Sequence, residues 1–160
     1  MINKEKILRP VHSIFAFGAL LSLGGMIVVV GIQVISRFFL EITPHWTEEA
    51  ARMLFVYSVA FGTGTGISNG DFIRLNLIGK YLSPASERFL QLLTDILILT
   101  FSVIIIIHGF SFVRLGMDET SPALQISMGF VFFSMVIMGL AIFIFTIEAL
   151  IFPVKGNNQI

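Results

Sequence analysis

Charged residues of both signs and one aromatic residue gather in a short stretch whose spacing suits an ion-pair network rather than catalysis. Arg37 closes one long apolar run, and Glu48, Glu49 and Arg52 open the next. Trp46 lies beside them and is the single tryptophan in the chain. An indole ring prefers the boundary between lipid and water, and ionisable groups that enter lipid are costly unless they are paired or hydrated. We therefore expect a turn at one membrane surface.

Two arrangements of this cluster are open. Glu48 and Arg52 are four residues apart, a spacing that favours a weak surface ion pair on a helix, and acids in a first turn suit the helix dipole. Alternatively, Arg37 forms a partly buried bridge with Glu48 or Glu49, which would fix the first two helices or meet a partner.

The composition indicates the class of protein that must position this cluster. Only 12% of the residues are charged and 56% are hydrophobic, about half the charge of a typical soluble domain, and the mean hydropathy is +0.93. The chain is therefore predicted to be an all-α integral membrane protein. Its net charge of zero gives no indication of nucleic acid binding. Because it has no cysteine, disulfides, thiolate nucleophiles and cysteine-ligated metals are excluded.

Uncharged runs divide the chain into four predicted transmembrane helices. Each run, with its flanking residues, reaches the roughly 20 residues that a crossing needs. Three of the five prolines follow a hydroxyl residue, which is a helix-start signal; these pairs are Thr43-Pro44, Ser83-Pro84 and Ser121-Pro122. Residues 71–83 are too polar to cross, and they are expected to form a short interfacial helix or a loop. The predicted helices cover about 11–39, 46–69, 86–115 and 122–152 of a single membrane domain, 1–160.

A stripe of small residues marks one face of the second helix. Ser58, Gly62 and Gly66 recur at four-residue spacing, which lets two helix backbones approach closely in lipid. The contact is either with another helix of this chain or with another subunit. Glu49 points roughly opposite this stripe on a helical wheel, so the two faces are expected to have different neighbours.

The basic residues predict the orientation. With both ends on one side, that side holds seven of the ten Lys and Arg residues and the other holds three. The excess marks the cytoplasmic side, so both termini are expected to be cytoplasmic. The seven are Lys4, Lys6, Arg9, Arg74, Lys80, Arg88 and Lys155, and the three are Arg37, Arg52 and Arg114.

Few ionisable groups fall within the predicted crossings. Asp95 is the one acid inside a span, and it is read either as a group near the headgroups or as a buried functional site. His12, His45 and His108 are scattered. A haem would need two histidines facing one another across the iron, which leaves His45 and His108 as the one candidate pair. No catalytic, cofactor or metal residues are assigned, and the chain is not expected to be an enzyme.

Two segments together resemble a known family. SRFFL at residues 36–40 and WTEEAARMLFVYSVAFGTG at residues 46–64 are similar to the small membrane subunit of tripartite ATP-independent periplasmic (TRAP) transporters, the DctQ type. The family often carries H-x-x-V-D after the second helix, whereas residues 72–76 here read FIRLN. The matching positions are Arg37, Trp46, Glu48, Glu49, Arg52 and Gly62.

The resemblance implies an accessory subunit in a bacterial inner membrane. A large TRAP membrane subunit would hold the substrate and sodium ions, and a periplasmic substrate-binding protein would deliver an organic acid, such as a dicarboxylate or sialic acid. This chain would brace the large subunit, with no cofactor of its own. Two alternatives are a haem-bearing membrane anchor of a redox complex and a small four-helix drug exporter. The exporter would carry an acid within its first helix, and residues 11–36 contain none.

Overall fold

The structure is a computed structural model that describes residues 4–39, 44–68 and 84–151, and this part of the chain is all-helical. Its four helices are α1 (Lys4–Phe39), α2 (His45–Ser68), α4 (Pro84–Met117) and α5 (Met128–Ile151). The all-α prediction is thus confirmed for the described residues. Three of the helices, α1, α4 and α5, are long and apolar enough to cross a membrane. The fourth, α2, is less apolar, because hydroxyl, charged and glycine residues interrupt its sequence.

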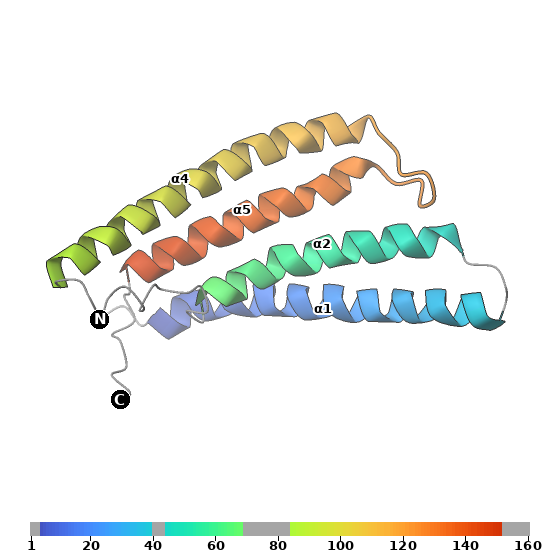
Figure 1. Ribbon diagram of the computed structural model, residues 1–160, viewed down its shortest axis with the longest axis horizontal. Helices are drawn as coiled ribbons and strands as arrows, with labels where there is room; N and C mark the ends of the chain where they lie inside the picture. Colours follow the sequence, from blue (N-terminus) through green and yellow to red (C-terminus); the bar gives the residue numbers. More distant parts are fainter. Residues whose placement is uncertain (1–3, 40–43, 69–83, 152–160) are drawn as a thin grey trace.

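The helices lie side by side in the order α1, α2, α5, α4 (Figure 1). Each of the hairpins α1–α2 and α4–α5 packs along its length, and α2 packs against α5 to join the two hairpins. Consecutive apolar helices with short connections are expected to pack as antiparallel neighbours. The packing of α2 against α5 could not be predicted from the order of the helices in the chain, since α4 lies between them in the sequence.

The buried core lies where α1 begins and where α2 and α5 end. Phe15, Ala141 and Phe145 are its buried members. The Phe15 and Phe145 rings meet edge to face with centroids 5.3 Å apart, a favoured aromatic geometry. Partly buried residues pack around them: Val11, Phe61, Ile67 and Ile137.

Glycines permit the closest helix approaches. A Cβ on Gly64 would lie 2.5 Å from the Phe145 ring and 3.0 Å from Phe15, and one on Gly116 would lie 2.7 Å from the backbone nitrogen of Gly129. Both glycines are buried. Small residues let helix backbones approach closely where lipid offers no hydrophobic driving force for association.

The predicted start of the last helix is wrong: α5 begins at Met128 rather than near residue 122. The Ser121 hydroxyl does accept the N–H of Leu124 at 3.3 Å, as a capping residue should. However, Gln125 has a φ of 55°, in the left-handed region, which ends this turn after a few residues. Ser127 then caps α5, its hydroxyl accepting the Gly129 N–H at 3.2 Å.

The other predicted boundaries differ less. The first helix begins at Lys4, ahead of the predicted residue 11, with Pro10 inside it, whereas α2 and α4 begin and end within two residues of prediction. Pro44 lies at the start of α2, where its carbonyl accepts the Thr47 hydroxyl at 2.7 Å. Thr43, Ser83 and the interfacial segment predicted at 71–83 lie outside the described residues.

Candidate partner interface

The first turn of α2 places its two glutamates on different sides. Glu48 accepts a hydrogen bond from the Arg52 guanidinium at 3.1 Å, and both side chains are about 70% exposed. This is the surface ion pair that the four-residue spacing favours. An exposed pair of this kind contributes little to stability, so its charges are available to solvent or to a partner.

Glu49 instead contacts the turn between α4 and α5. Its carboxylate accepts hydrogen bonds from the Ser121 hydroxyl, from the Ala123 N–H at 3.1 Å and from the Leu124 N–H at 3.0 Å. The Ser121 hydroxyl is the main cause that holds the pKa of Glu49 below its ordinary value; burial opposes this effect, and the two amides and the Arg52 charge add to it. The ionised carboxylate therefore fastens α2 to the neighbouring hairpin.

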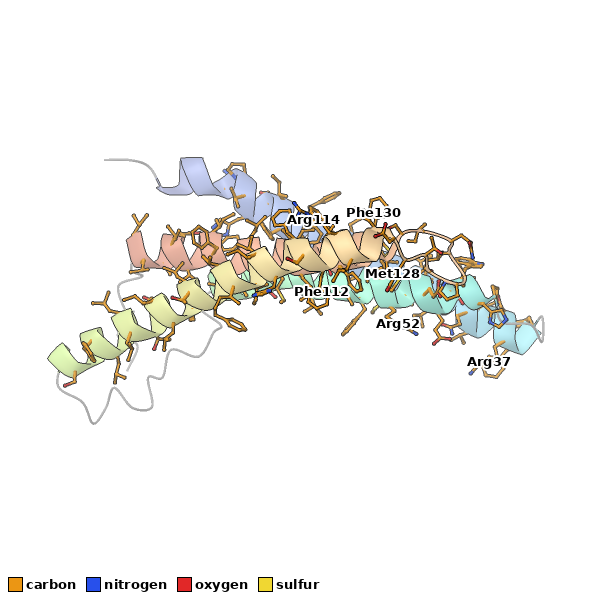
Figure 2. All side chains as sticks on the ribbon, turned by 90° about the horizontal axis from the view of Figure 1, so that it is seen from above. Arg37, Arg52, Phe112, Arg114, Met128 and Phe130 are labelled. Atoms are coloured by element: carbon orange, nitrogen blue, oxygen red, sulfur yellow. The ribbon has the colours of Figure 1, made fainter. Side chains whose placement is uncertain are left out.

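Arg37 lies apart from both glutamates. It is exposed in the last turn of α1, and Figure 2 shows it at the end of the molecule, away from Arg52. Within the described part of the chain it pairs with neither Glu48 nor Glu49. Trp46 lies in the first turn of α2, and its side chain is 40% exposed. Of the two arrangements left open by the sequence, the structure shows the Glu48–Arg52 pair.

A second feature of α2 is a face that no other described helix covers, formed by Phe55, Ser58, Val59 and Gly62. A Cβ added to Gly62 would meet nothing within 4 Å, and Phe55 and Val59 are 54% and 45% exposed. The Ser58 hydroxyl bonds to the carbonyl of Phe55 in its own helix at 2.7 Å. We call this surface the open face of α2. It contains Ser58 and Gly62 of the small-residue stripe, and Glu48 and Arg52 lie on the same side of the helix at its start.

The glycine that serves packing inside the chain is Gly64, which the spacing argument missed. It receives the Phe145 ring, whereas Gly62, two residues earlier, faces open space. A four-residue stripe identifies one face of a helix, but it does not say which neighbour that face meets. The contact of α5 with Gly64 is the information that the sequence lacked.

Two polar contacts between helices also escaped the sequence analysis. The Tyr57 hydroxyl donates to the carbonyl of Phe130 at 2.6 Å, which links α2 to the first turn of α5. His12 of α1 lies 2.9 Å from the carboxylate of Glu148 in α5. The one signal in the sequence was that Glu148 is an acid at the end of an apolar run. That position is as typical of an exposed helix end at the membrane surface as of a contact between helices.

The remaining ionisable candidates do not converge. His45 is exposed at the start of α2 and His108 is exposed on α4, two helices between which α5 lies (Figure 1). The structure therefore does not bring them together as paired ligands. Asp95 is half-buried on α4, and the described residues contain no group of three or more potential metal ligands.

Comparison with known families decides the class. Residues 26–156 match the family model of the DctQ component of tripartite ATP-independent periplasmic transporters. The chain belongs to the DctQ family. It is also 22% identical over 154 residues to a Haemophilus influenzae protein named provisionally as a TRAP transporter small permease protein, with 96% of this chain and 93% of that protein covered. The DctQ match includes the first turn of α2 and its open face, whereas His12 lies before it.

The DctQ family places this chain among the subunits of transporters, and its three membrane-capable helices agree with a multi-pass membrane protein. A tripartite system has further components besides a DctQ subunit. The open face of α2, with the exposed ion pair at its start, is the candidate surface for meeting one of them.

Proposed function

We propose that this chain is the small scaffold subunit of a TRAP-type secondary transporter in a bacterial inner membrane. In this role it braces a large transport subunit, which carries out sodium-coupled uptake of an organic acid of the dicarboxylate or sialic acid class. A periplasmic binding protein delivers that acid. The first turns of α2 and α5, which face the periplasm in this proposal, help to dock the binding protein.

The single observation that carries this proposal is the open face of α2. This helix is less apolar than the other three described helices, and its uncovered side presents Gly62, the Ser58 hydroxyl and an ion pair. Lipid does not favour such a surface, whereas small residues and hydroxyls are common where membrane helices pack together. The occupant that fits is an apolar helix of a larger membrane subunit, which could lie close against the backbone at Gly62.

A scaffold role also agrees with how the chain uses its buried polar groups. The hydroxyls of Ser102 and Ser134 donate to carbonyls of their own helices, Leu99 at 2.7 Å and Val131 at 2.6 Å. A hydroxyl that donates its proton in this way cannot also donate it to a substrate carboxylate. Ion-coupled carriers instead place discontinuous helices and unwound backbone around a midplane site.

We further propose that α2 is a fourth crossing and that both termini are cytoplasmic. It runs beside α1 and α5 along their length (Figure 1), and the basic residues favour that orientation. Because the chain has no cysteine, His45→Cys and Asn157→Cys can each be labelled alone in cells. Reagent outside the inner membrane should reach the first and not the second, and labelling of both would contradict this orientation.

Substitutions at two glycines test the interface. Neither Gly62 nor Gly24 of α1 has an atom within 4 Å of an added Cβ, so leucine at either position should leave the isolated chain folded. Gly62→Leu should greatly reduce copurification of the large subunit, whereas the matched control Gly24→Leu should retain it. Normal copurification with Gly62→Leu would mean that the partner does not meet this face.

A further inference from the structure

A partly buried polar pair joins α1 to α5 at the end of the molecule where α1 begins, with the His12 side chain 30% exposed. His12 Nε2 lies 2.9 Å from Glu148 Oε2, and the Glu148 side chain is only 8% exposed. The imidazole donates this hydrogen bond when its Nε2 carries a proton. The His12 ring also meets the edge of Phe145 at a centroid distance of 4.8 Å. None of these contacts belongs to the open face of α2.

The helices α1 and α5 do not pack against each other along their length. Phe15 of α1 contacts Phe145 of α5 near this pair, and α2 separates the two helices elsewhere (Figure 1). Apolar contact is non-directional, so ring packing alone tolerates small sliding and rotation of one helix on the other. A hydrogen bond requires a defined distance and angle. The pair is thus the most direction-sensitive of these contacts between α1 and α5.

We propose that His12 and Glu148 are positioning residues that set the register of α1 against α5. Polar pairs of low exposure are often no more stabilising than apolar residues of the same size, but removal of one partner is costly because the remaining group loses a hydrogen bond. Single polar contacts in otherwise apolar helix interfaces are known to fix register at some cost in stability. By this logic the pair defines one alignment of the two hairpins.

This inference deepens the scaffold proposal, because the alignment of the hairpins determines how the open face of α2 is presented to a partner. It concerns a residue, His12, outside the segment that matches the DctQ family. It also makes a prediction that differs from a purely stabilising role. Replacement of both His12 and Glu148 by apolar residues should give a chain that is as stable as the native one, but in which α1 and α5 no longer adopt a single register.

The test uses the full-length chain in lipid nanodiscs. Because the native sequence has no cysteine, spin labels attach only at Phe17→Cys on α1 and Ile151→Cys on α5, which are exposed positions (68% and 63%). The distance distribution between the labels is measured in the otherwise native chain and in four variants. These are His12→Phe, Glu148→Leu, the two combined, and the exchanged pair His12→Glu with Glu148→His.

The native pair should give one narrow distance distribution. Each single variant should lower the melting temperature and broaden the distribution. The apolar double variant should recover the melting temperature but keep a broad or shifted distribution, and the exchanged pair should return a narrow one. A narrow, native distribution in the apolar double variant would overturn the proposal, as would a broad one in a folded exchanged variant. No large subunit is present in these samples, so a negative result would leave the scaffold function standing.

Discussion

The Ser121 hydroxyl donates a hydrogen bond to the carboxylate of Glu49, which lies 72 residues earlier in the chain. This contact joins α2 to the turn between α4 and α5, and the Tyr57–Phe130 hydrogen bond adds a second link about two helix turns further along α2. At the opposite end, Phe145 packs against Gly64. The two hairpins are therefore joined at both ends, which is what a rigid brace requires.

The first prediction concerns the carboxylate of Glu49. Glu49→Gln keeps the size of the side chain but removes the charge that accepts three hydrogen bonds, so the melting temperature of the isolated chain in detergent should fall. The matched control is Glu48→Gln, which breaks only an exposed ion pair and should have little effect. Equal melting temperatures for the two variants would show that the contact between Glu49 and the turn does not hold the hairpins together.

The same contact predicts a dependence on pH. The Ser121 hydroxyl and the turn amides hold the pKa of Glu49 below its ordinary value of 4.5. Because the pKa is lower in the folded state, the stabilisation is complete above the unfolded value and is lost as the pH falls through the folded value. The difference in melting temperature between the native chain and Glu49→Gln should be constant near neutral pH and should shrink below about pH 4.5. A difference that grows on acidification would contradict this assignment.

Two neighbouring glycines of α2 should respond oppositely to alanine. Gly62→Ala adds a methyl group in open space and favours the helix, so it should stabilise the isolated chain by about 0.5–1 kcal/mol. Gly64→Ala places a methyl group against the Phe145 and Phe15 rings, and such overpacking typically costs about 1–3 kcal/mol. Chemical or thermal unfolding in detergent measures both changes. A destabilised Gly62→Ala chain would mean that the open face is packed within the chain after all.

The next prediction concerns Arg37, for which the sequence left open a partly buried bridge to Glu48 or Glu49. Since its side chain is exposed, Arg37→Ala should change the free energy of unfolding of the isolated chain by no more than about 0.5 kcal/mol, as surface substitutions usually do. Arg114→Ala, at another exposed arginine, is the control. A loss of about 3–5 kcal/mol, typical of a broken buried ion pair, would restore the bridge between Arg37 and a glutamate.

The sequence predicts the features of the fold that depend on a single segment of the chain, and it fails where a feature depends on contacts between segments. Uncharged runs locate the helices because crossing length is a property of one segment alone. The Ser121-Pro122 pair was correctly recognised as a cap, but it caps a single turn, since Gln125 adopts the left-handed conformation that ends it. That outcome depends on the hydrogen bond between the Ser121 N–H and the Ile126 carbonyl, which closes the loop beyond the cap.

The same distinction between local and long-range contacts explains which part of the candidate interface could be predicted. The spacing of Glu48 and Arg52 encodes their own ion pair, because both residues lie on one helix. The partners of Glu49 and Glu148 lie 72 and 136 residues away, and nothing local distinguishes these acids from solvated ones. Their roles emerge only once α5 and the turn before it are placed beside α2, with the end of α5 near the start of α1.

The central claim is that this chain supports transport and performs none by itself, and proteoliposomes test it most directly. Vesicles that contain the purified chain alone are supplied with a sodium gradient, a radiolabelled dicarboxylate or sialic acid, and the cognate periplasmic binding protein. Our account predicts no accumulation above that of empty vesicles, and sodium-dependent uptake once the large subunit is reconstituted with the chain. Sodium-dependent accumulation by the small chain alone would contradict the account.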